Sequence, residues 1–251
     1  MGSLDERVAI VTGGARGIGR AYCLGLAGEG AKIISADMAD SSETVSLVKE
    51  AGGDADQVTT DVSDKASTEQ MAAFALERFG RIDILVNNAG YFVTLKRGPW
   101  TEIPVDEWDK AFHINVRGVW LCCLAVWPQM KEQGSGKIIN ITSNVIYRGV
   151  PNFLHYSASK SALVGLTRSL AREVGEHGIS VNAVAPEYIP SSPELTAVNP
   201  PGQNEMVVQQ RIFKRTQLPE DMVGTILFLA GPGSDFITGQ SILVNGGSCF
   251  V

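Results

Sequence analysis

The sequence lacks the features that mark membrane proteins and nucleic-acid-binding proteins. No apolar run approaches the ~20 residues that a membrane-spanning helix requires, and the amino-terminal stretch contains no apolar signal region. Acidic side chains outnumber basic ones, 27 to 21, and no basic stripe is available for a nucleic acid. The composition therefore predicts a cytoplasmic protein that has neither a membrane nor a nucleic acid as its partner.

Cysteine and histidine are scarce as well. Of the four cysteines, Cys122 and Cys123 are adjacent, and Cys23 and Cys249 lie near opposite ends of the chain. They do not have the spacing of metal ligands, and the three histidines do not complete a set with them. We expect no metal site, and reduced, mostly buried thiols.

The chain does contain a regular alternation of strand-like and helix-like segments. The expected strands are Arg7–Val11, Lys32–Ala36, Val58–Thr60, Ile82–Val86, Lys137–Ile141, Ser180–Ala185 and Ser241–Val244. The expected helices are Ile18–Glu29, Ser42–Ala51, Ser67–Phe79, Val105–Met130, His155–Glu176 and Met222–Ala230. This alternation predicts an α/β fold of the Rossmann type, with a doubly wound parallel sheet of seven strands flanked by helices. Because no linker or internal repeat divides the sequence, residues 1–251 are expected to form a single domain.

Polar and glycine-rich segments follow most of the expected strands. In a parallel sheet the carboxyl ends of the strands meet at one edge, where ligands bind, so we expect these segments to converge there. The stretch from Pro186 to about Gln217 is irregular in pattern and rich in proline in its first half. A long irregular segment in a compact domain is often a lid, and residues 186–217 are therefore expected to form a substrate-binding loop.

Tyr156 and Lys160 have a spacing that suits acid–base chemistry. They are four residues apart, so on a helix they share one face, and a lysine ammonium beside a phenol favours the phenolate and lowers its pKa. Such a pair can exchange a proton with an alcohol or a carbonyl. Taken alone, a Tyr and a Lys at this spacing are more often an amphipathic surface pair.

A glycine-rich turn joins the first expected strand to the first expected helix. Glycines in the stretch Thr12–Gly19 allow a close approach to phosphate, and the helix N-terminus attracts negative charge. Asp37 ends the second strand, where its carboxylate can accept hydrogen bonds from ribose hydroxyls and would repel a 2′-phosphate. Asp37 therefore favours NAD over NADP. Arg16 argues the other way, because it could pair with that phosphate, and a helix N-cap is an alternative role for Asp37.

The chain resembles the short-chain dehydrogenase/reductase family from about Arg7 to Gly247, and within it the 1-phenylethanol dehydrogenase-like NAD-dependent alcohol dehydrogenases. The resemblance rests on Thr12–Gly19, Asp61, Val62, Asn87–Gly90, Asn115, Ser143, Tyr156, Lys160, Asn182, Pro186 and Ile237–Gln240. The resemblance implies a homotetramer in which the helices around Val105–Met130 and His155–Glu176 pack across interfaces.

The resemblance also implies roles for individual residues. Ser143 would hydrogen-bond the substrate oxygen, Tyr156 would exchange a proton with it, Lys160 would bind the nicotinamide ribose, and Asn115 would hold a water linking that lysine to solvent. An ordinary polar position on a helix is the alternative for Asn115. The residues expected to contact the dinucleotide are Gly13, Arg16, Gly17, Ile18, Gly19, Asp37, Asp61, Val62, Asn88, Ala89, Gly90, Tyr156, Lys160, Pro186, Ile189 and Ser191.

The sequence departs from the family's pattern at three positions. The family generally has Pro-Gly after the sixth strand, where this chain has Pro186-Glu187. Ser191 replaces a threonine that binds the nicotinamide carboxamide, and Asn245 replaces an aspartate before two glycines. Glu187 is expected either to shape specificity or to point to solvent.

The candidate substrate pocket is mostly apolar and aromatic, as small-molecule pockets tend to be. Its expected members are Phe92, Val93, Leu95, Val145, Tyr147, Phe153, His155, Glu187 and Tyr188, although several of them could instead be core residues. The pattern favours an NAD(H)-dependent oxidoreductase that interconverts a hydrophobic secondary alcohol, aryl alcohols included, and its ketone. The alternatives are an NADP(H)-dependent 3-oxoacyl-type reductase and, in another class, a non-catalytic protein that senses dinucleotides.

Overall fold

The computed structural model describes residues 2–191 and 201–251 and contains one parallel sheet of seven strands. The strands are β1 (Val8–Thr12), β2 (Lys32–Asp37), β3 (Ala55–Thr59), β4 (Ile84–Asn87), β5 (Gly136–Ile141), β6 (Ile179–Pro186) and β7 (Ser241–Val244), in the order β3-β2-β1-β4-β5-β6-β7. Every neighbouring pair is parallel. The predicted doubly wound, seven-stranded Rossmann-type sheet is confirmed, with strand boundaries within a few residues of those expected.

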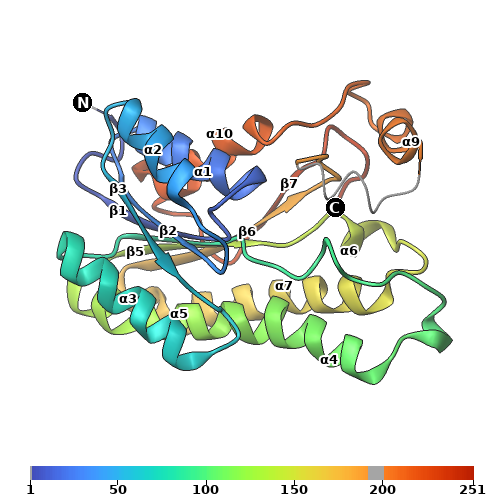
Figure 1. The fold of residues 1–251 in the computed structure, drawn as a ribbon, viewed down its shortest axis with the longest axis horizontal. Coiled ribbons are helices and arrows are strands. Elements are labelled where there is room, and N and C mark those ends of the chain that lie inside the picture. Colours follow the sequence, from blue (N-terminus) through green and yellow to red (C-terminus); the bar gives the residue numbers. More distant parts are fainter. Residues whose placement is uncertain (1, 192–200) are drawn as a thin grey trace.

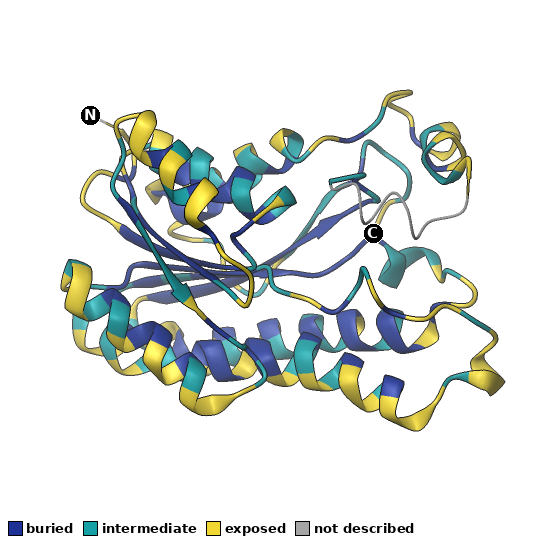
Figure 2. Cartoon of the chain, viewed as in Figure 1, coloured by how far each residue is buried: buried dark blue, intermediate teal, exposed yellow. Residues whose placement is uncertain are grey.

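Helices cover both faces of the sheet (Figure 1). On one face lie α1 (Gly17–Gly28), α2 (Ser42–Glu50) and α10 (Glu220–Ala230), and on the other lie α3 (Lys65–Phe79), α5 (Gly118–Gln133) and α7 (Leu154–Val174). Two apolar clusters fill the layers, one against α1 and α10 and the other against α3, α5 and α7. Figure 2 shows the result, a sheet whose central strands are buried and helices that are exposed on their outer sides.

The helical region predicted over Val105–Met130 is helical, but it is not uniform. It consists of α4 (Val105–Phe112), a π-helical turn η2 (His113–Arg117) and α5. The π-turn carries the buried Asn115, whose side chain bonds to groups outside the helix, as described below. A π-helical turn inserts an extra residue into a helix, and such turns occur frequently at functional sites.

Several short elements were not expected from the sequence. These are α6 (Val145–Arg148), α9 (Gln203–Gln210) and the 3-10 turns η1 (Trp100–Glu102) and η4 (Pro232–Ser234). The 3-10 turn η3 (Gly175–His177) forms the end of the helix expected over His155–Glu176. Helix α9 occupies part of the predicted irregular loop, residues 186–217, and begins after Gly202, whose φ is 78°. Residues 192–200 of that loop lie outside the described residues, and its role as a lid stays a prediction.

Two searches of the described ranges bear on possible partners. No helix in residues 2–191 and 201–251 is long and apolar enough to cross a membrane. Within the same ranges, no group of three or more His, Cys, Asp or Glu side chains could hold a metal ion. The four cysteines are free, and Cys23, Cys122 and Cys123 are buried.

Candidate active site

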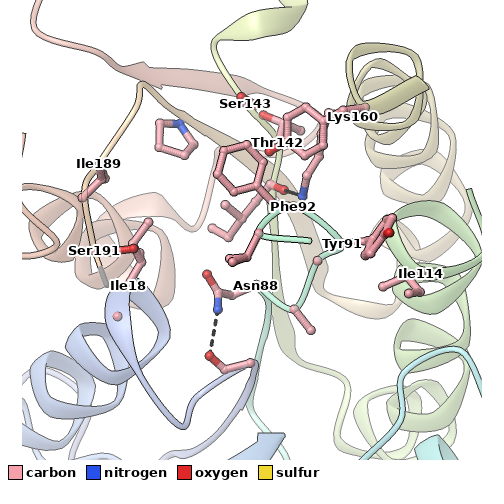
Figure 3. Close-up of a pocket in the computed structure, with 18 of the residues that line it drawn as sticks. Ile18, Asn88, Tyr91, Phe92, Ile114, Thr142, Ser143, Lys160, Ile189 and Ser191 are labelled. Carbon is pink, nitrogen blue, oxygen red and sulfur yellow. Dashed lines mark hydrogen bonds between the residues drawn. The ribbon is translucent and has the colours of Figure 1, made fainter. Parts of the chain in front are cut away.

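The glycine-rich turn follows β1 and leads directly into α1. Gly13 and Gly17 have φ values of 68° and 57°, which lie in the left-handed region that favours glycine. A methyl group on Gly13 would lie 2.9 Å from Nδ2 of Asn88, and one on Gly19 would overlap the carbonyl oxygen of Gly13. Asn88 holds the turn from the neighbouring strand end, because its Nδ2 donates to the carbonyl oxygens of Thr12 (3.0 Å) and Gly13 (3.1 Å). Figure 3 draws one of the hydrogen bonds of Asn88.

Asp37 connects the end of β2 to this turn. Its carboxylate accepts hydrogen bonds from the backbone amides of Ala15 (3.1 Å) and Ala39 (2.9 Å). At the end of the next strand, Asp61 accepts from the amide (2.9 Å) and the hydroxyl (2.7 Å) of Ser63. Both carboxylates line the same cavity. The expected convergence of strand-end residues is therefore observed.

This cavity has a volume of about 1020 Å³ and runs along the carboxyl ends of the strands. Its lining includes every residue that was expected to contact the dinucleotide: Gly13, Arg16, Gly17, Ile18, Gly19, Asp37, Asp61, Val62, Asn88, Ala89, Gly90, Tyr156, Lys160, Pro186, Ile189 and Ser191. In Figure 3, Ile18, Ile189 and Ser191 lie on one side of it, and Ser143 and Lys160 lie on the other.

Glycines keep this cavity open at two points. A methyl group on Gly17 would lie 3.2 Å from Oγ of Ser191, and one on Gly90 would lie 3.4 Å from Nζ of Lys160. Larger side chains at these two glycines would narrow the cavity. The cavity is bordered by the N-terminus of α1 and by the carboxylate of Asp37, and this combination suits a phosphate-bearing dinucleotide. The residues present therefore fit such a group.

Asn115 lies behind the cavity rather than in its lining. It is completely buried, and its Oδ1 accepts from the amide of Tyr91 at 2.6 Å. Its Nδ2 donates to the carbonyl oxygen of Tyr91 (3.3 Å) and to Oγ of Ser159 (3.0 Å). Asn115 thus connects the π-turn to the segment after β4 and to α7, the helix that carries Tyr156 and Lys160.

Ser143, Tyr156 and Lys160 all line the cavity. Ser143 follows β5, and Lys160 reaches back from α7 to donate a hydrogen bond from Nζ to the carbonyl oxygen of Ile141 at 2.8 Å. The Lys160 Nζ atom lies 6.0 Å from the centroid of the Tyr156 ring. The three side chains that the sequence proposed for proton transfer are therefore brought to one place.

The pKa of Tyr156 differs from the expectation that Lys160 lowers it. Burial raises the pKa of Tyr156 to about 12, and a hydrogen bond with Ser143 and the positive charge of Arg97 oppose this rise only in part. Burial also lowers the pKa of Lys160 to about 8. Desolvation is the largest cause of both pKa shifts, because both side chains lie almost out of reach of water.

Six of the nine expected pocket residues line the cavity, namely Phe92, Val93, Val145, Phe153, Glu187 and Tyr188. Three do not appear among the described residues that line it: Leu95, Tyr147 and His155. Leu95 is buried in a small apolar cluster with Phe153 and Tyr156. His155 is completely buried, and burial lowers its pKa. Being adjacent to Tyr156 on a helix, it points about 100° away from it around the axis.

Aromatic rings surround the Tyr156 phenol. Its ring stacks on Phe153 with centroids 4.6 Å apart, and Phe92 lies 5.0 Å away at a tilt. The guanidinium of Arg97 lies 4.4 Å from the Phe153 centroid. Arg97 and Arg148 line the cavity, but no sequence signal identified them, because isolated arginines in irregular segments have no characteristic spacing.

Comparisons with known proteins agree with this geometry. A family model described as enoyl-(acyl carrier protein) reductase matches residues 13–248. The chain is 37% identical over 251 residues to a 3-oxoacyl-[acyl-carrier-protein] reductase of Synechocystis sp., with 98% of each chain covered. It is also 37% identical over 252 residues to the levodione reductase of Leifsonia aquatica, and the match covers 96% of this chain and 94% of the relative.

Solved structures give the same result. The crystal structure of levodione reductase matches with a TM-score of 0.91 at 34% identity, with 97% of each chain covered. A Beutenbergia cavernae protein described as an NAD(P)-dependent gluconate 5-dehydrogenase, with bound NADP, matches with a TM-score of 0.90 at 34% identity, covering 98% of this chain and 97% of that one. The chain therefore belongs to the short-chain dehydrogenase/reductase family, oxidoreductases that bind a nicotinamide dinucleotide.

Proposed function

We propose that this protein is an NAD(H)-dependent oxidoreductase that interconverts a hydrophobic, aryl-bearing secondary alcohol and its ketone. The observation that carries the proposal is one cavity in which Ser143, Tyr156 and Lys160 lie beside the aromatic rings of Phe92 and Phe153. Polar groups of this kind fix a reactive oxygen, and an apolar lining accommodates the rest of a small molecule.

The side chains have distinct roles in this proposal. Ser143 donates a hydrogen bond to the substrate oxygen, and Tyr156 passes its proton to the same oxygen during ketone reduction. Lys160 binds the ribose of the dinucleotide, which supplies or accepts the hydride when bound. Because the pKa of Tyr156 is raised to about 12, its phenol is protonated at neutral pH and ready to donate. Alcohol oxidation needs the phenolate, so its rate rises with pH.

The preference for NAD rests on Asp37. Its carboxylate lines the cavity at the end of β2 and is bonded to the glycine-rich turn through the amide of Ala15. A negative charge at this position accepts hydrogen bonds from ribose hydroxyls and repels a 2′-phosphate. Arg16 also lines the cavity and is the group that would favour NADP.

An NADP(H)-dependent 3-oxoacyl-type reductase is the alternative function. It is supported by relatives, since 3-oxoacyl-[acyl-carrier-protein] reductases of Synechocystis sp. and Staphylococcus epidermidis are 37% and 38% identical to this chain. A dinucleotide sensor without turnover is less well supported, because such a protein has no need for a hydroxyl, a phenol and an ammonium group in one cavity.

A substrate panel tests the proposal. Aryl and alkyl secondary alcohols would be offered with NAD and with NADP, and a 3-oxoacyl thioester with NADH and NADPH. We expect the aryl alcohols with NAD to give the highest kcat/KM, and activity confined to the thioester with NADPH would favour the alternative. Tyr156→Phe is expected to reduce kcat at least ~100-fold, since proton transfer by a positioned group contributes about 10²–10⁴-fold.

Tyr22→Phe is the matched control for that variant. Tyr22 is completely buried in α1, and its hydroxyl has no hydrogen-bond partner among the described residues. Loss of this hydroxyl should leave kcat unchanged. Equal turnover by the Tyr156→Phe variant and the wild type on the best substrate would refute the proposed role of Tyr156.

A further inference from the structure

Glu187 is a buried carboxylate that lines the cavity and is already fully bonded. Its Oε2 accepts hydrogen bonds from Nδ2 of Asn144, from Nη1 of Arg148 at 2.9 Å and from Oγ of Ser248 at 2.7 Å. Its Oε1 accepts from the backbone amide of Tyr188 at 3.1 Å. Its side chain is only 5% exposed. These four donors leave little capacity for a substrate group, and the burial excludes the expectation that the carboxylate points to solvent.

A second layer of hydrogen bonds connects Glu187 to Asn245. Nδ2 of Asn245 donates to Oδ1 of Asn144 at 3.1 Å and to the carbonyl oxygen of Cys249 at 3.0 Å. Oδ1 of Asn245 accepts from the backbone amide of Gly247 at 2.9 Å. Asn144 therefore lies between the two side chains, with its oxygen toward Asn245 and its amide nitrogen toward Glu187.

Chemistry fixes the direction of this chain of bonds. An ionised carboxylate can only accept, so Asn144 must turn its NH₂ group toward Glu187. The oxygen of Asn144 then accepts from two donors, the NH₂ group of Asn245 and the thiol of Cys249. An aspartate at position 245 could not donate, and it would place a second carboxylate on the other side of the same amide.

The network joins three segments at the proposed active site. Asn144 directly follows Ser143, Glu187 begins the segment that carries Ile189 and Ser191, and Asn245 begins the carboxyl-terminal segment. Figure 1 shows that the carboxyl terminus lies close to α6, the helix that follows Asn144. Asn144, the residue next to Ser143, is thus hydrogen-bonded to two distant parts of the sequence.

We propose that Glu187 and Asn245 are a coupled pair of positioning residues that act through Asn144 to hold Ser143 against the segment 187–191. Both are positions where the sequence departs from the family's pattern, and the structure places the two departures at opposite ends of one network. The pairing stands on the contacts alone, whereas the consequence for catalysis rests on the proposed function.

A double-mutant cycle with Glu187→Gln and Asn245→Asp tests the pairing. Asn245→Asp alone should lower the unfolding midpoint and reduce kcat about 10-fold, because Asn144 then faces two acceptors. In the double variant Asn144 can turn over, so that the new amide at position 187 donates to its oxygen and its NH₂ group donates to the new carboxylate at position 245. Because Arg148 also loses its carboxylate partner at position 187, recovery is partial, and we expect the loss in midpoint of the double variant to be smaller than the sum of the two single losses.

The unfolding midpoint tests the pairing of Glu187 with Asn245, and kcat tests its consequence for catalysis, so the pairing and the proposed function can fail separately. Additive changes in the unfolding midpoint would overturn the pairing, even if the wild type turned over none of the tested alcohols. An unchanged kcat in Asn245→Asp, measured well below its unfolding midpoint, would overturn the positioning of Ser143.

Glu43→Gln provides the control cycle. Glu43 forms an ion pair with Arg20 at 2.7 Å, and its side chain is 70% exposed. Combined with Asn245→Asp, it should give additive changes in midpoint, because the two sites share no hydrogen-bond partner among the described residues. Non-additivity in this control cycle equal to that of the Glu187 cycle would also overturn the pairing.

Discussion

Lys160 is a buried amine whose only hydrogen-bond partner, within the described part of the chain, is the carbonyl oxygen of Ile141. A neutral carbonyl compensates an ammonium charge less well than water does, so burial lowers the pKa of Lys160 from 10.5 to about 8. This lysine is therefore partly neutral in mildly alkaline solution. Folding therefore changes the charge of Lys160 at mildly alkaline pH, because it buries the amine.

The shift in Lys160 predicts how stability depends on pH. Between pH 8 and pH 10.5 the unfolded chain binds a proton that the folded chain lacks. The contribution of Lys160 to the free energy of unfolding therefore rises with pH across that window, by up to about 1.4 kcal/mol per pH unit. Denaturant titrations should show that the free energy of unfolding of the wild type, relative to that of Lys160→Met, increases by about 2 kcal/mol from pH 7.5 to pH 10.

Lys49→Met is the control for this measurement. Lys49 is exposed at the end of α2, so its replacement removes a lysine whose environment is similar in the folded and unfolded chains. The difference between this variant and the wild type should stay constant with pH. Tyr156 is protonated over the same window in the folded wild type, because its pKa is raised to about 12. A pH-independent difference for Lys160→Met would contradict the prediction.

At the level of single residues, the sequence was informative where chemistry depends on residue type and spacing. Tyr156, Lys160 and Asp37 were predicted to share one site, and the structure places all three in one cavity. The raised pKa of Tyr156 could not be predicted, because burial depends on how Phe92 and Phe153 pack around it. No local pattern specifies such contacts.

Among the elements, α1 shows how a helix can carry the cofactor turn at one end and a packing surface along its length. It begins at Gly17 in the glycine-rich turn and packs against α10. A methyl group on Gly25 would overlap Cγ1 of Val223 on α10, whereas one on Gly28 would meet no atom within 4 Å. The two glycines are in the same helix but in opposite environments.

These two glycines give a matched pair of predictions. Gly25→Ala should lower the free energy of unfolding by about 1–3 kcal/mol, because β-branched Val223 has few rotamers with which to yield. Gly28→Ala should leave it unchanged or raise it by up to about 1 kcal/mol, since alanine has the higher helix propensity. Urea unfolding of both variants measures the difference. Equal effects would show that α1 and α10 do not pack as closely as the structure indicates.

Long periodic elements were predictable, and short or interrupted ones were not. The seven strands and the main helices follow from apolar patterns and from glycines such as Gly80, which ends α3 with a φ of 76°. The π-turn at Asn115 follows from hydrogen bonds to Tyr91 and Ser159, which are distant in sequence. Helix α6 has four residues, too few for a period to be recognised.

On the scale of the whole molecule, some of the exposed apolar side chains lie on the outer sides of helices α5 and α7. Trp120 and Leu124 are 51% and 40% exposed, and they are four residues apart on α5, so they share one face. Leu154 at the start of α7 is also exposed. These are the helices that the family resemblance assigns to subunit interfaces, and we propose that a second copy of this chain covers them.

The family resemblance implies a tetramer, and we propose that its assembly depends on the exposed face of α5. Trp120→Glu should shift the mass in sedimentation equilibrium from that of four chains to that of one or two, because a buried unpaired carboxylate is strongly unfavourable. Trp100→Glu is the control, since Trp100 is 72% exposed but lies in η1 rather than on α5. Far-ultraviolet circular dichroism would show that both variants remain folded. A wild-type mass of one chain, or an unchanged mass for Trp120→Glu, would exclude α5 as an interface.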